Sequence, residues 1–430
     1  MKKRIGFARG WTVLAAVLLI AACGGGGSGG GKGGGGTTST GVFLDAEVEG
    51  LTWHASPSGL AGTTNAAGEF LYRDGDTVSF SVGAILLGSA PAVGIMTPQT
   101  LASAMDADTL LQAGVTAADV ALNIAIFLQT FDSEQGDGIR IDPAVAGAAT
   151  TALNFLQLPT AFAADAELLN LAGDDYTVVT PADAEEHVNN TVLGKLYGSW
   201  RLETDETAEA LMAVVSFFPG GRYVLGVNHG DDPECFDGVE YGTFELDALA
   251  GELRTTGASP DTTGVNGDCG LHYENDAANN ISGFALVNEN RFMLVSRHPE
   301  ELEDPPMFLN RIVNDGIYGS WAIAEEQEDT LTAVLTILAD GTYMVAQLDE
   351  DAGVEVGSYL LSNGVLTPDE IYTDTNDDTG LHDPETGEKA SIILSVDESG
   401  CLVLEPDDED VVMFFAPIPD ATGDCLAKNG

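Results

Sequence analysis

The second half of the chain carries an internal duplication, and no other feature of the sequence constrains the fold as strongly. The segment Leu196–Trp200, Leu-Tyr-Gly-Ser-Trp, recurs at Ile317–Trp321 as Ile-Tyr-Gly-Ser-Trp. Four more blocks recur in the same order, namely 213–224 with 333–344, 240–244 with 355–359, 266–272 with 376–382, and 307–309 with 413–415. Each copy consists of short β-prone runs separated by Gly, Asn and Asp. We therefore predict two duplicated antiparallel β-barrel or β-sandwich domains at residues 196–315 and 316–430.

Both copies open in the same way. A Gly-Ser-Trp sequence ends at Trp200 in the first copy and at Trp321 in the second, and an apolar run and a Gly-x-Tyr hairpin at Tyr223 and Tyr343 follow. This opening resembles the start of lipocalin-like barrels. The resemblance implies that the Trp closes one end of a barrel whose interior holds a small apolar ligand. We expect these four aromatic residues to be core residues, with a ligand-facing position as the alternative.

The first half of the chain divides into two parts. Residues 41–91 contain five strand-length runs, at 42–44, 51–53, 69–72, 77–82 and 85–87, separated by turn-forming residues. The segment Thr64–Phe70 resembles the turn-and-strand signature of prealbumin-like or carboxypeptidase-regulatory-like β domains. That resemblance implies a small β domain with a structural or binding role and no catalysis.

Residues 92–195 have a helical pattern instead. A helix capped by Thr116 is expected to bury one apolar stripe, made of Val120, Ile124, Phe127, Leu128 and Phe131. Further helices are expected from Asp142-Pro143 through Leu156, from Asp165 to Leu171, and from Thr180-Pro181 through Leu193. The expected fold class is therefore α+β and mainly β, with a small β unit, a helical block and two duplicated β domains.

The N-terminal residues 1–22 have the composition of an export signal. Basic residues precede an apolar run, Trp11–Ala22, that is too short to span a bilayer as a mature helix. Ile20-Ala21-Ala22-Cys23 resembles a bacterial lipoprotein signal, in which the cysteine is diacylated and becomes the new N-terminus. The resemblance implies a lipid anchor at Cys23, and an ordinary signal peptide that contains a cysteine is the alternative.

The residues after Cys23 bear on location. Gly24 follows the cysteine, and lipoproteins of this type that lack Asp at that position usually reach the outer membrane of Gram-negative bacteria. The resemblance thus implies a protein of the cell envelope, on its periplasmic or its surface side. Residues 23–40 are rich in glycine and cannot bury apolar surface, so we expect a flexible tether with an r.m.s. span of about 23 Å.

The chain is strongly acidic, with 16 Lys and Arg against 68 Asp and Glu and a formal net charge of -52. Electrostatic repulsion makes nucleic acid and anionic lipid headgroups poor partners for such a protein. An acidic, solvated surface or binding of multivalent cations explains the composition.

Four cysteines remain once Cys23 is assigned to lipid: Cys235, Cys269, Cys401 and Cys425. An even number of cysteines in an exported chain indicates disulfides, for which three connectivities exist. The domain division favours Cys235 with Cys269 and Cys401 with Cys425. A zinc site is the alternative, but the chain has no Cys-x-x-Cys pair.

A candidate calcium loop lies in the second copy. Asp374, Asn376 and Asp378 occupy positions 1, 3 and 5 of a loop in which Glu385 falls at position 12, the spacing of a calcium-binding loop. Thr379 stands where such a loop has Gly. An Asx-rich turn explains the same residues without a metal.

Catalysis has little support in the sequence. His272 and His382 occupy equivalent places in the two copies, each without a second histidine at metal-ligand spacing. The chain has neither a His-Glu-x-x-His nor a Walker motif, and its Gly-x-Ser-x-Gly lies in the tether at residues 26–30.

Three hypotheses of function follow. The first is a membrane-anchored, non-catalytic binding or adhesion module for a small ligand, a glycan or a protein, which predicts an apolar pocket or an exposed aromatic patch in each repeat. The second is a calcium-stabilised structural protein of the envelope. The third, with less support, is an extracellular hydrolase.

Overall fold

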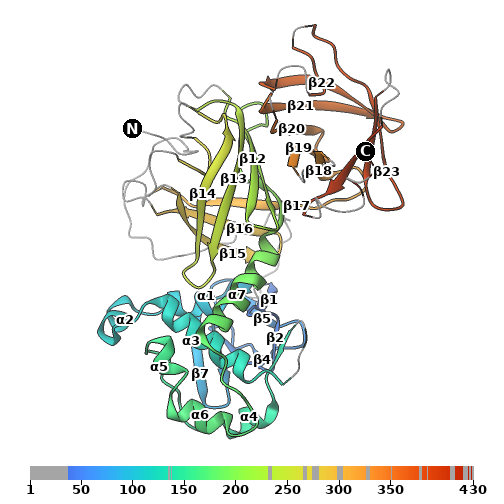
Figure 1. Ribbon diagram of the computed structural model, residues 1–430. Coiled ribbons are helices and arrows are strands. Elements are labelled where there is room, and N and C mark those ends of the chain that lie inside the picture. Colours follow the sequence, from blue (N-terminus) through green and yellow to red (C-terminus); the bar gives the residue numbers. More distant parts are fainter. Residues whose placement is uncertain are drawn as a thin grey trace, which may run out of the picture.

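The computed structural model describes residues 37–428, with short internal gaps. The gaps are 134, 135, 137, 231–234, 265–268, 274–279, 298–303, 326–329, 350, 377–379, 385, 407–411, 420–424, 426 and 427. The predicted signal peptide, Cys23 and the glycine-rich run to Gly36 lie outside these residues, as do Asp378 and Glu385. The fold is α+β and mainly β, as predicted, and its N-terminal unit lies below two β-barrels in Figure 1.

The N-terminal unit contains three small sheets, ordered β5-β1-β8, β4-β3-β6-β7 and β2-β9. The strands are β1 (Thr38–Phe43), β2 (Val48–Glu49), β3 (Thr52–Ser56), β4 (Ala61–Thr63), β5 (Glu69–Arg73), β6 (Thr77–Val82), β7 (Ile85–Pro91), β8 (Ile95–Met96) and β9 (Ile139–Arg140). In β6 the alternation expected from the sequence is present, because Val78, Phe80 and Val82 are buried and the residues between them are not. The Phe80 ring meets Phe70 edge to face at 5.2 Å in the core.

The described part of the chain contains seven helices. They are α1 (Pro98–Ser103), α2 (Ala107–Ala113), α3 (Ala117–Thr130), α4 (Pro143–Ala148), α5 (Pro159–Phe162), α6 (Ala166–Ala172) and α7 (Pro181–Leu196). Of these, α1 packs against β7 and β8, and α3 packs against α1, α5 and α7. The predicted helix after Thr116 is α3, whose first turn is closed by reciprocal hydrogen bonds between Thr116 and Asp119. No single helix in the described part of the chain is long and apolar enough to cross a membrane, whereas α2 and α3, bent by 79°, meet that criterion jointly.

The predicted helix from Asp142 to Leu156 is shorter than expected. It forms α4 and ends at Ala148, and Ala149 leaves the helical conformation with ψ 76°. The Ala149 carbonyl accepts a hydrogen bond of 2.7 Å from the Ala84 backbone N–H, in the turn between β6 and β7. A tertiary hydrogen bond therefore ends the helix where the alanine-rich sequence alone would continue it.

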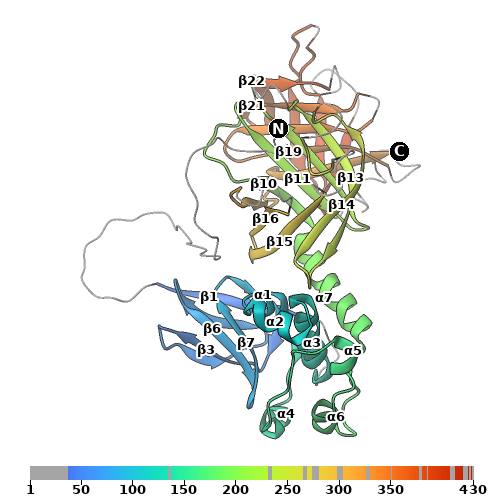
Figure 2. The ribbon, with the colours of Figure 1, turned by 90° about the vertical axis from the view of Figure 1, so that its left-hand side faces the viewer.

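Each duplicated copy is a closed, eight-stranded antiparallel barrel in which sequential strands are neighbours (Figures 1 and 2). Barrel 1 consists of β10 (Gly198–Leu202), β11 (Met212–Phe218), β12 (Arg222–Asn228), β13 (Gly238–Asp247), β14 (Glu252–Asp261), β15 (Ile281–Asn288), β16 (Arg291–Ser296) and β17 (Met307–Ile312). Barrel 2 consists of β18 (Gly319–Glu325), β19 (Thr330–Ile337), β20 (Thr342–Gln347), β21 (Gly353–Ser362), β22 (Val365–Asp374), β23 (Ile392–Val396), β24 (Leu402–Pro406) and β25 (Met413–Pro417). Pairing of the first strand with the last closes both barrels, with lipocalin-like geometry.

The barrels pack against each other through the outer faces of β11–β13 and β19–β21. Every residue of β11 is buried, because one face of the strand lines barrel 1 and the other meets barrel 2. Two apolar clusters form this contact. One joins Phe218, Val224 and Val239 to Val334 and Ala346, and the other joins Leu338, Met344 and Val354 to Val214. The residues of the second cluster are the repeat equivalents of those of the first, so the interface has approximate two-fold symmetry.

Barrel 1 also rests on the N-terminal unit. The indole Nε1–H of Trp200 donates to the carbonyl oxygen of Leu196, the last residue of α7, at 2.8 Å. The Ala248 backbone N–H, in the β13–β14 turn, donates to Asn189 Oδ1 of α7 at 2.9 Å. The end of barrel 1 that bears Trp200 is therefore covered by α7 (Figure 1). The opposite end, where β14 ends and β15 begins, is called the mouth of the barrel.

Candidate functional site

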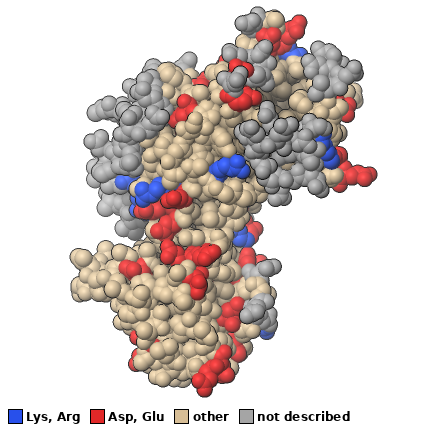
Figure 3. Space-filling model, in the orientation of Figure 1, with Lys and Arg blue, Asp and Glu red and all other residues tan. Residues whose placement is uncertain are grey.

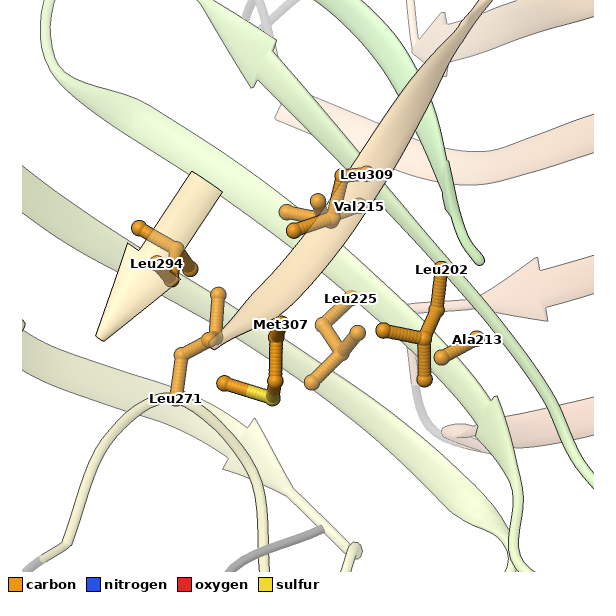
Figure 4. Close-up of a pocket in the computed structure, with 8 residues that line it drawn as sticks. All are labelled: Leu202, Ala213, Val215, Leu225, Leu271, Leu294, Met307 and Leu309. Atoms are coloured by element: carbon orange, nitrogen blue, oxygen red, sulfur yellow. The ribbon is translucent and has the colours of Figure 1, made fainter. Parts of the chain in front are cut away.

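A small apolar cavity lies inside barrel 1 (Figure 4). Its lining residues are Leu202, Ala213, Val215, Leu225, Leu271, Leu294, Met307 and Leu309. The cavity volume is about 30 Å³, which is far below the several hundred Å³ of ordinary ligand sites. Since its lining side chains are apolar, a trapped water would lack hydrogen-bond partners there. The site suits an aliphatic group in preference to a polar one.

None of the four predicted aromatic residues lines this cavity, although Trp200 is paired with the lining residue Val215. Trp200 is fully buried and meets Phe292 edge to face at 4.7 Å, within an aromatic cluster at the covered end of the barrel. The guanidinium of Arg311 lies 4.0 Å from the centre of the Trp200 ring. Tyr223 is fully buried as well. Trp200 thus closes one end of the barrel, as the lipocalin-like resemblance implies.

Barrel 2 repeats this construction with one change. The Trp321 Nε1–H donates to the Ile317 carbonyl oxygen at 3.1 Å, as Trp200 does to Leu196. Trp321 is paired across the closing strands with Pro417, however, where Trp200 is paired with Arg311. Like Tyr343, Trp321 belongs to the core of barrel 2.

The equivalent lining of barrel 2 is bulkier. Strand registers align the eight cavity residues with Ile323, Ala333, Leu335, Val345, Leu381, Leu404, Met413 and Phe415. Phe415 replaces Leu309 and Leu335 replaces Val215, while Val345 is the one smaller side chain. Phe415 is 6% exposed and packs into the barrel core. The duplicate thus places a ring where barrel 1 has free space.

A buried glutamate lies beside the cavity. Glu240 of β13 is fully buried, and its Oε1 accepts hydrogen bonds from the Tyr223 hydroxyl and from the His272 backbone N–H at 3.0 Å. Its Oε2 accepts from the Leu271 backbone N–H at 2.9 Å. A Cβ on Gly270 would lie 1.5 Å from that oxygen, so the carboxylate leaves room for glycine alone.

Barrel 2 contains the same arrangement. Glu355 is fully buried and accepts hydrogen bonds from the Tyr343 hydroxyl, from the Leu381 N–H at 2.6 Å and from the His382 N–H at 3.3 Å. A Cβ on Gly380 would lie 1.7 Å from its Oε2. Sequence reasoning noted the repeated Gly-Leu-His but missed both glutamates, although a Glu at the same place in both copies was a usable signal.

These glutamates have altered ionisation. Burial and the neighbouring Asp261 raise the pKa of Glu240 to about 8, and burial raises the pKa of Glu355 to about 7. Burial and the facing glutamate also raise the pKa of Tyr223 well above its usual value. Because backbone amides and a tyrosine hydroxyl already occupy the carboxyl oxygens, the arrangement holds the loop and presents no free base to a substrate.

The two histidines and Asp374, one of the predicted calcium residues, are in ordinary contacts. His382 Nδ1 lies 2.7 Å from Asp374 Oδ2, and His272 Nδ1 lies 3.4 Å from Thr255 Oγ1. Asn376 is fully buried. In the part of the chain that the structure describes, no group of three or more His, Cys, Asp or Glu side chains is placed to hold a metal ion. The calcium loop, half of which lies outside that part, stays a prediction.

Two disulfides form, between Cys235 and Cys269 and between Cys401 and Cys425. This is the connectivity that the domain division favours, with each bond inside one copy. The first bond holds the start of the loop that carries Gly270, Leu271 and His272.

Comparison with known proteins gives no match: no family model, no curated protein and no solved structure corresponds to this chain. The function of the chain is therefore inferred from its own sequence and fold.

Proposed function

We propose that this protein is a lipid-anchored lipoprotein of the Gram-negative outer membrane that acts as a non-catalytic binding module, with barrel 1 as the binding domain. The observation that carries the proposal is the apolar cavity inside barrel 1, whose eight lining residues do not include Trp200. The lipoprotein-type signal ending at Cys23 supports the anchor. The lipocalin-like opening of each copy supports a small apolar ligand.

The surface and the lining restrict the ligand. An apolar lining without polar groups favours an aliphatic chain, whose polar part, if any, stays outside the barrel. The face in Figure 3 carries many acidic and few basic side chains, consistent with the net charge of -52. Repulsion by this surface disfavours an anionic headgroup, so a neutral or cationic ligand is expected.

Binding is tested with N-phenyl-1-naphthylamine, a neutral apolar fluorophore, added to the purified full chain. We expect a saturable rise in fluorescence with a stoichiometry of one. Leu309→Phe, which introduces the residue of barrel 2, should abolish it by filling the cavity. The matched control, Phe415→Leu in barrel 2, should keep binding in barrel 1. Absence of saturable binding to the unmodified chain would contradict the proposal.

The anchor is tested separately. In a Gram-negative host fed an alkyne-tagged fatty acid, the chain should incorporate the tag and fractionate with the outer membrane. Cys23→Ser should lose both the tag and the membrane association. A tagged Cys23→Ser chain would show that the lipid is attached elsewhere.

A further inference from the structure

The cavity of barrel 1 is too small for the ligand that its lining suits, and one side of it is formed by a loop. We infer that the segment of residues 270–273, which follows the disulfide-bonded Cys269, is a movable cap over the mouth of barrel 1 and that Glu240 is the positioning residue that holds it closed. This inference rests on the proposed function, because it concerns how a ligand enters the same site.

The cap is fastened through its main chain. Leu271 and His272 donate their backbone N–H groups to Glu240, and the Leu271 carbonyl accepts a hydrogen bond of 2.9 Å from Thr255 Oγ1. The Tyr273 N–H donates to Asn280 Oδ1 at 2.6 Å. Leu271 therefore has two contacts that matter for the cap. Its backbone is hydrogen-bonded to Glu240, and its side chain forms part of the cavity wall (Figure 4).

Entry of a ligand therefore requires a specific local change. The remaining lining side chains come from barrel strands, whose backbones are held by ladder hydrogen bonds on both sides. Leu271 is the lining residue that belongs to a loop. Releasing its backbone from Glu240 enlarges the site without breaking the barrel, whereas moving any strand would cost several ladder bonds.

The duplication supplies a matched control. In barrel 2 the corresponding amides of Leu381 and His382 both donate to Glu355, there through Oε2 alone, but Phe415 fills the adjoining space. A change at Glu355 thus reports what the buried carboxyl does for folding. A change at Glu240 reports that same contribution together with any role in ligand entry.

The test measures association of N-phenyl-1-naphthylamine with the full chain by stopped-flow fluorescence. In Glu240→Gln the carboxamide has one acceptor oxygen and one NH₂ group, so one cap amide loses its acceptor. We expect the association rate to rise about tenfold, the effect of losing one buried hydrogen bond. Glu355→Gln should lower the melting temperature to a similar extent and leave the association rate unchanged.

Equal association rates in both variants and the unmodified chain would overturn the cap and leave the proposed function intact. Failure of the unmodified chain to bind the probe would overturn the proposed function itself. Hydrogen exchange on the unmodified chain needs no variant. With bound probe, the exchange rates of the Leu271 and His272 amides should change and those of Leu381 and His382 should not, and a change in neither pair would also overturn the cap.

Discussion

The guanidinium of Arg311 lies 4.0 Å above the ring of Trp200, and the two residues are paired across β10 and β17, the strands that close barrel 1. Arg311 also donates hydrogen bonds to the carbonyl oxygens of Tyr197 and Lys195, at the end of α7. The Arg311 side chain thus connects the strand pair that closes barrel 1 with α7, the helix that precedes the barrel in the chain. Barrel 2 has Pro417 at this position and lacks such a link.

Arg311→Ala should therefore destabilise the protein. Arg311 Nε–H also donates to the Glu289 carbonyl oxygen at 3.0 Å. Loss of the cation–π contact and of three hydrogen bonds to backbone carbonyl groups, two of them half-buried, predicts a decrease of about 2–3 kcal/mol in the free energy of unfolding. Arg254→Ala, on the exposed outer side of β14, is the control and should change it by less than about 0.5 kcal/mol. Chemical denaturation of the full chain measures both, and equal effects would show that the Arg311 contacts contribute nothing specific.

Stability should fall as the pH rises from about 5 to about 8. The pKa is raised to about 8 for Glu240 and to about 7 for Glu355 and Asp45, in each case mainly by burial. Below their unfolded-state pKa values these groups are protonated in both the folded and the unfolded state, so they do not make the free energy of unfolding depend on pH. Above them the unfolded chain releases protons that the folded chain retains, so stability is lost until the folded pKa is passed.

The measurement is the free energy of unfolding as a function of pH. Each of the three groups contributes a slope of up to about 1.4 kcal/mol per pH unit within its window. Asp45→Asn removes one titrating group and should reduce the slope between pH 5 and 7. Carboxyl groups with a lowered pKa, such as Asp340 and Asp76, lose their stabilising effect at more acid pH. An unchanged slope in Asp45→Asn would contradict the assignment.

Filling the cavity should not harm folding. Leu309→Phe removes a void of about 30 Å³, which predicts a gain of up to about 0.7 kcal/mol in the free energy of unfolding. The reverse change, Phe415→Leu, removes packed ring atoms and should cost about 1–2 kcal/mol. Thermal and chemical unfolding of both variants measure these effects. A strong loss of stability in Leu309→Phe would show that the barrel cannot accept the ring of its duplicate.

The interface between the barrels should make them unfold together. Val239 is fully buried among residues of both barrels, so Val239→Asp would place a carboxylate in an apolar contact at a cost of at least about 3 kcal/mol. We expect the calorimetric transition of the barrels to split in this variant. Val313→Asp, in the exposed linker between the barrels, should leave a single transition. Splitting in neither variant would contradict the proposed coupling.

The sequence by itself determined the organisation that depends on local pattern and on repetition. Two β domains of similar build follow from the repeated blocks. The capping residues Thr116 and Asp119 and the apolar spacing after them define α3, and the alternation from Val78 to Val82 defines β6. These features are visible because period, caps and turn residues act over a few neighbouring positions.

Tertiary structure decided the rest, because the contacts concerned join residues far apart in the chain. A bond between Ala84 and Ala149 ends α4, and packing between barrels buries both faces of β11. Glu240 accepts a hydrogen bond from the backbone N–H of Leu271, which lies 31 residues later in the chain. No local sequence pattern therefore shows that this glutamate is buried or that it binds this loop. Leu309 lines the cavity of barrel 1, and barrel 2 has the larger Phe415 at the equivalent place. That difference reaches the barrel interior only because eight strands surround the same space.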